Sequence, residues 1–188
     1  MPAGAKRIQG YARHSITDAN YQQNDIQFLI GKVVTGWEPW RIIPEKYSTS
    51  CILFTIKNES PIVVFSDGPK FSRDVTFDAD FFASLPGNSP LPEHQAREIV
   101  EAKWALGDFF YHGSNLSSQP AKVLALKFKG MQSFGYIWSE FFNDGRYYAS
   151  SMACGLKVLP IERFESESLG LAFKEDKKVW TERRNLQS

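Results

Sequence analysis

Several features that would announce a function are scarce in this chain of 188 residues. Its two cysteines, Cys51 and Cys154, make no CxxC pair and no metal-ligand spacing, so we expect buried free thiols. The formal net charge is only +1, which indicates neither nucleic acid nor a membrane as a partner. No run approaches the ~20 apolar residues of a membrane span, and the polar segment 1–24 lacks the apolar stretch of a secretory signal. We therefore expect a soluble, intracellular protein of the cytoplasm.

Residue types that carry catalysis are also few, since the chain has three histidines and no GxxxxGK[ST], GxGxxG or GxSxG motif. His94 and Glu98 are four residues apart without a third ligand, so we predict no metal and no cofactor. The string Tyr111-His-Gly-Ser114 is similar to the nicotinamide-binding strand of ADP-ribosyltransferases, which implies a small enzyme centred on His112. Because only 76 residues follow His112, fewer than that fold needs, we favour a protein that is not an enzyme and keep the small enzyme centred on His112 as a third alternative.

Aromatic side chains, in contrast, are abundant, at 14% of the residues. Twelve of them lie between Trp104 and Tyr148. The charge is uneven as well: residues 61–120 sum to −4, whereas residues 121–160 sum to +3. The basic bias therefore falls on the aromatic part of the chain.

The apolar pattern predicts an α+β fold, mostly antiparallel sheet in two runs of strands that a helical segment separates. Alternation and turn residues place the first run at 26–34, 51–56 and 61–65, with a turn at Trp37–Trp40 and a four-residue loop at 57–60. The second run is expected at 123–129, 134–142, 146–152, 156–164 and 169–173.

Helical spacing of apolar residues predicts one principal helix near residues 92–106, with its apolar face on the sheet, and a shorter helical segment at 78–85. We assign residues 1–24 to an N-terminal arm that is ordered only where it docks. Residues 25–173 form a single domain in this interpretation, and 174–188 form a charged C-terminal tail.

Asp144-Gly145 is the most specific local signal, because a type I′ hairpin turn needs positive φ at both central residues. If these two residues form the loop, Asn143 pairs with Arg146 and Phe142 with Tyr147. Side chains alternate along a strand, so one face of this hairpin should hold Phe134, Tyr136, Trp138, Phe142 and Tyr147.

This aromatic face leads us to expect a non-enzymatic binding protein, with single-stranded nucleic acid as the favoured ligand. Bases would stack on Phe134, Tyr136 and Trp138, beside Tyr147. The phosphates would be neutralised by three basic residues, Lys127, Lys129 and Arg146. The string Phe134-Gly-Tyr-Ile137 resembles, over four residues, the centre of the ribonucleoprotein octapeptide of RNA-recognition and cold-shock domains.

For the aromatic surface itself, two alternatives stay open. The same aromatic surface suits a protein–protein interaction subunit or inhibitor, because Tyr, Trp and Arg dominate the energetics of such interfaces. The rings are equally suited to a buried core, since cross-strand aromatic pairs stabilise hairpins and the helix expected near 92–106 could cover them.

Overall fold

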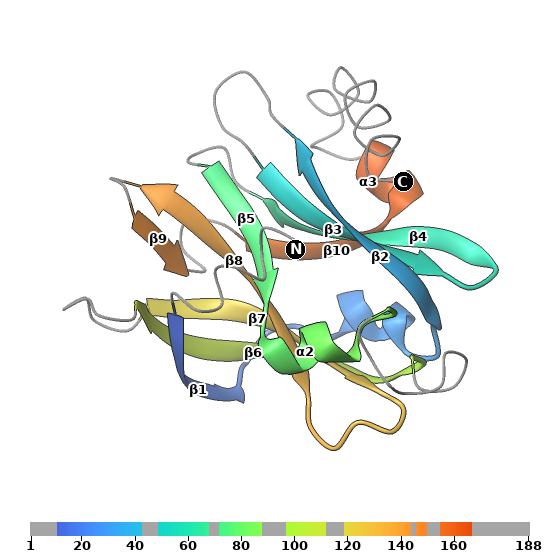
Figure 1. Cartoon of the computed structure of the whole chain (residues 1–188), viewed down its shortest axis with the longest axis horizontal. Coiled ribbons are helices and arrows are strands. Elements are labelled where there is room, and N and C mark those ends of the chain that lie inside the picture. The colour runs from blue at the N-terminus through green and yellow to red at the C-terminus, as the bar shows by residue number, and fades with distance from the viewer. Residues whose placement is uncertain are drawn as a thin grey trace.

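The computed structural model describes residues 11–42, 49–67, 72–87, 97–111, 119–143, 146–149 and 155–166. These residues form a 10-stranded, mostly antiparallel sheet with three short helices (Figure 1). The strands are β1 (Tyr11–Asp18), β2 (Val34–Ile42), β3 (Thr49–Ile56), β4 (Glu59–Asp67), β5 (Ser72–Phe77), β6 (Ile99–Tyr111), β7 (Gln119–Phe128), β8 (Gly135–Asn143), β9 (Arg146–Ala149) and β10 (Gly155–Pro160). The helices are the 3-10 helix η2 (Asn24–Leu29), α2 (Ala79–Ser84) and α3 (Ile161–Ser166).

The strand order is β1-β6-β7-β8-β5-β3-β4-β10, with β2 added to β3 and β9 to β8. The strands lie in two groups that face each other, with β1, β6 and β7 in one and β2, β3, β4 and β10 in the other (Figure 1). One margin of the groups is joined through β5, where Arg73 pairs in parallel with Thr49. The opposite margin is joined by an antiparallel bridge between Val33 and Glu98. The two groups are therefore tied together at both margins.

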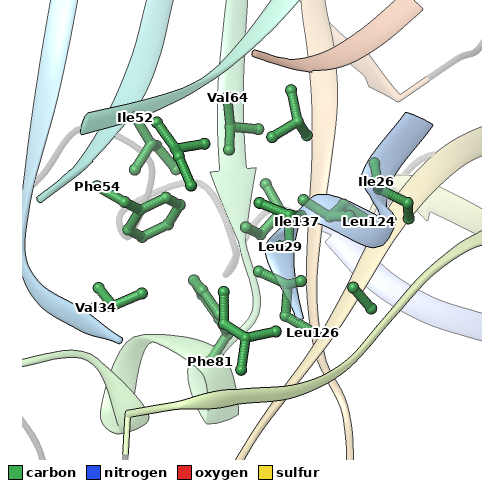
Figure 2. Packing of buried hydrophobic residues seen from close by; sticks show 14 of the residues in the cluster. Ile26, Leu29, Val34, Ile52, Phe54, Val64, Phe81, Leu124, Leu126 and Ile137 are labelled. Atoms are coloured by element: carbon green, nitrogen blue, oxygen red, sulfur yellow. The ribbon is translucent and has the colours of Figure 1, made fainter. Parts of the chain in front are cut away.

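The main core fills the space between the two groups (Figure 2). Each strand contributes alternate residues to it, for example Ile52 and Phe54 from β3 and Leu124 and Leu126 from β7. The apolar void at its centre measures only about 10 Å³, so side chains fill the interior. A small second cluster lies outside the β3–β4 pair, where α3 buries Phe164.

The mostly antiparallel sheet is confirmed, but the principal helix is wrong. Residues 99–106 belong to β6, which pairs with β7 on one side and β1 on the other. The error has a physical cause in a bulge between Ile99 and Glu101. The extra residue puts Ile99 and Ala102, three positions apart, on the core side, which imitates the i, i+3 spacing of a helix. The fold is thus strand-rich with short helices, and residues 92–96 lie outside the described part.

Three other expectations of the first run also need correction. Residues 24–29 form η2 instead of a strand. Trp37–Trp40 lies inside β2, where Pro39 is tolerated because, among the described residues, this part of β2 pairs with β3 alone and lies at an edge. The hairpin between β3 and β4 is confirmed, but its loop is Lys57-Asn58, with Asn58 at φ 59°.

The later part of the chain agrees better with expectation. The short helical segment expected at 78–85 is confirmed as α2, which Asp78 caps, and the hairpin register is confirmed, with Asn143 opposite Arg146 and Phe142 opposite Tyr147. The strand predicted at 156–164 ends at Pro160, where α3 begins. The strand predicted at 169–173 and the tail at 174–188 lie outside the described residues. Within the predicted arm, Tyr11–Asp18 forms β1 and docks on β6.

The described helices are short, and none of them has the length and hydrophobicity that a bilayer crossing requires.

Candidate functional site

The predicted site lies on the outer face, which we define as the side of β6, β7 and β8 that points away from the main core. The pairing of β6 with β7 and of β7 with β8 brings distant parts of the sequence together on this face. Glu101 of β6 pairs with Lys127 of β7, and Lys103 pairs with Ala125, which in turn pairs with Tyr136 of β8. Phe134 directly precedes β8. Two partly buried rings, Phe134 and Tyr136, are thus brought next to basic residues.

Phe134 is the centre of this arrangement. The Lys103 ammonium lies 4.7 Å from the centroid of the Phe134 ring, and the Lys127 ammonium lies 5.7 Å from it. Both distances fall within the range of cation–π attraction. The sequence reading missed Lys103, because it assigned residues 99–106 to a helix. Alternation around the buried Trp104 is the signal that would have placed Lys103 on the outer face.

Trp138 does not share this exposure. It is only 2% exposed and packs with Ala105, Ala121 and Val123, with Ile16 and Tyr136 at the margin of the cluster. A ring buried in this way has no free π-face for a base, so the stacking role expected for Trp138 does not fit this structure. Trp138 therefore belongs to a buried cluster of the outer face, against which the partly buried Tyr136 packs.

Each basic residue of the outer face lies beside a carboxylate. Lys127 is 3.6 Å from Glu101, and Lys129 is 3.9 Å from Glu98. Lys103 is 3.0 Å from Asp18 of β1. The outer face therefore has a mixed charge instead of a basic one. Exposed pairs of this kind contribute about 0–1 kcal/mol and are screened by salt, so another anion can compete for the lysines.

The remaining predicted residues are placed only in part. Arg146 and Tyr147 stand in β9 in the expected register, but their side chains lie outside the described part of the structure. His112, His94 and Cys154 lie outside it entirely. In the ranges that the structure does describe, no three His, Cys, Asp or Glu residues are grouped as metal ligands. Cys51 is a buried free thiol, and burial raises its pKa to about 12, which keeps it protonated and unreactive.

A second polar cluster, which the sequence reading did not find, surrounds Trp104. The indole N–H of Trp104 donates to Asp25 at 2.9 Å, and the Trp104 backbone N–H donates to Gln23 at 2.7 Å. The Lys122 ammonium lies 4.0 Å from the Trp104 ring centroid and 5.2 Å from that of Tyr21. Burial lowers the pKa of Lys122, and Lys157 lowers it further, whereas Asp25 raises it. Side chains alternate along β7, so Lys122 lies on the same face as the core residues Leu124 and Leu126. Its side chain therefore lies at the end of the core.

A groove of about 210 Å³ lies near the start of β4, lined by Phe28, Lys32, Glu59, Ser60, Ile62 and Pro160. Lys32 and Glu59 form an ion pair in it. The Ser60 hydroxyl donates to Glu162 of α3 and lowers the pKa of that exposed carboxyl. The groove is smaller than the roughly 300–1,000 Å³ of usual small-molecule sites, so we do not place the function there.

Comparison with known proteins gives no match to any family model, curated protein or solved structure.

Proposed function

We propose that this chain is a binding protein without a cofactor that holds single-stranded nucleic acid on the outer face. The observation that supports this most is the Phe134 ring, which is partly exposed and has two lysine ammonium groups within 6 Å of its centroid. A π-face beside cations is the combination that non-specific single-strand binding uses, with stacking contributing ~1–3 kcal/mol per base.

In this proposal the bases stack on Phe134 and Tyr136, while Lys103, Lys127 and Lys129 contact phosphates. Each phosphate takes the place of a weak carboxylate partner. Three such contacts give a log–log dependence of affinity on salt with a slope near −2 for single strands.

The test is fluorescence anisotropy of a labelled oligothymidylate titrated with the full chain at several salt concentrations. We expect the slope near −2, and a weaker dependence, by about 0.7, for Lys127→Ala. Phe134→Ala should lower the affinity roughly 5–150-fold, which corresponds to the loss of one stacked base. The matched control is Lys57→Ala, which removes an exposed lysine from the β3–β4 loop and should change little. Absence of binding at 50 mM salt, or equal binding by Phe134→Ala, would remove the proposal.

A second candidate function, a protein-interaction subunit or inhibitor, is favoured by the mixed charge of the outer face. Lysines already paired with Asp18, Glu98 and Glu101 suit a partner with charges of both signs better than they suit a polyanion. In that case no oligonucleotide binds, and a partner that co-purifies with the chain is lost in Tyr136→Ala but kept in Tyr136→Phe. Retention of the partner by Tyr136→Ala would exclude this role for the outer face.

A further inference from the structure

Arg97, two residues before β6, carries a buried charge without a counter-ion among the described residues. Its side chain is 2% exposed, and its Nε and Nη1 atoms have no hydrogen-bond partner in the part of the chain that the structure describes. A guanidinium group is always charged in proteins. Buried charges are ordinarily paired or hydrogen-bonded, so we expect an anion beside the guanidinium group of Arg97.

The backbone around Arg97 is fixed on both sides. The Val34 N–H donates to the Arg97 carbonyl at 3.1 Å, and the Ile99 N–H donates to Lys32 at 2.9 Å. On the other side, the Lys129 N–H donates to the Glu98 carbonyl at 2.8 Å. These bonds form the seam that joins β2 to β6 to β7. The burial of Arg97 is thus a consequence of the closed fold.

The register also gives the direction of the side chain. Val33 pairs with Glu98, so Arg97 stands opposite Val34, which is a core residue with 1% exposure. Residues opposite each other in an antiparallel pair share a face. Arg97 therefore points to the core side of the seam, where a charge is poorly solvated.

The carboxylates near this seam are engaged elsewhere. Glu98 lies next to Arg97 in sequence but on the other face, beside Lys129. Glu101 lies beside Lys127, and Glu59 beside Lys32. Among the described residues, no carboxylate forms an ion pair with Arg97.

We propose that Arg97 is the binding residue of an oxyanion site, and that the chain takes up a small ligand through a phosphate or a carboxylate group. The planar guanidinium offers five N–H donors that match the oxygens of either group. Poor solvation at this position strengthens each of those hydrogen bonds. This site is separate from the outer face, and it does not depend on the function proposed there.

The test is thermal unfolding of the full chain with increasing sodium phosphate or sodium acetate, at an ionic strength held constant with sodium chloride. A ligand that binds only the folded state raises Tm, by about 5–10 °C at a hundred times its Kd for a chain of this size. We expect one of the two anions to do so, and the anion that acts distinguishes a phosphate ligand from a carboxylate ligand. Arg97→Met should abolish the shift, whereas Arg163→Met, at an exposed arginine of α3, should keep it.

The same variants give a second readout. Without added anion, Arg97→Met should melt at a higher temperature than wild type, because an apolar residue of similar volume replaces an unpaired buried charge. If Arg97→Met does not fold, isothermal titration of phosphate and acetate into wild type gives the answer directly. No heat of binding, together with a Tm that neither anion changes, would overturn the proposal.

Discussion

At the scale of single residues, Gly135 shows how closely the sheet approaches the helix below it. A Cβ atom at this position would lie 2.6 Å from both Cβ and Cδ2 of Phe81 and 3.0 Å from its Cα. Phe81 cannot retreat, because its ring stacks on Phe128 and meets the edges of Phe54 and Phe77. Glycine is required at position 135 because the packing leaves no room for a side chain.

Gly135→Ala should therefore destabilise the protein by about 1–3 kcal/mol, the usual range for overpacking a core. Urea unfolding monitored by tryptophan fluorescence measures the loss. Gly155→Ala is the matched control, since a Cβ at that strand position meets no atom within 4 Å. Equal stability of the two variants would show that Phe81 moves more freely than its ring contacts indicate.

At the scale of elements, one carboxylate joins α2 to β8. Asp78 Oδ1 accepts hydrogen bonds from the backbone N–H of Phe81 at 3.0 Å and from that of Tyr136 at 3.2 Å. The Asp78 N–H donates in turn to the Tyr136 carbonyl at 3.0 Å. Asp78 thus caps the helix and fixes the start of β8 through the backbone of Tyr136, whose ring lies on the outer face.

We predict that Asp78→Ala costs about 2–4 kcal/mol, because it removes an N-cap and leaves two backbone N–H groups without an acceptor. Asp78→Asn should recover most of this loss, since its amide oxygen can accept the same bonds. Both values come from chemical denaturation at neutral pH. A cost below about 0.5 kcal/mol for Asp78→Ala would mean that water replaces the carboxylate, which its burial opposes.

The elements differ in how far local sequence determined them. Asp144-Gly145 predicted the register of β8 and β9 because a two-residue turn fixes which residues face each other. The short helical segment at 78–85 was also predicted from the sequence, although its cap at Asp78 was not. β6 was not, because its bulge imitates helical spacing and its identity as a strand depends on β1 and β7.

At the scale of the whole molecule, the candidate sites depend on contacts that sequence cannot supply. Lys103 meets Phe134 across a sheet, and Asp18 of β1 meets Lys103 from 85 residues away in the chain. The burial of Trp138 depends on β1 and β6 in the same way. The sequence placed Arg97 within the helix expected near 92–106, whereas the seam between β2 and β6 places it on the core side. The residue types suggested candidate binding residues, and the strand pairing determines which of these residues lie together on one face.

The same topology makes the core a single structure shared by both groups of strands. Leu124 is fully buried within this core, which is closely packed around a void of only about 10 Å³. Removing most of its side chain should therefore leave a cavity. Leu124→Ala should cost about 3–5 kcal/mol and lower Tm by roughly 6–20 °C. Val123→Ala, its neighbour on the opposite face of β7, lies in the small cluster with Trp138 and should cost less, about 1–2 kcal/mol.

Far-ultraviolet circular dichroism and tryptophan fluorescence should report coincident transitions, because the two groups of strands unfold together. Separate transitions in Leu124→Ala would show instead that the two groups are independent units.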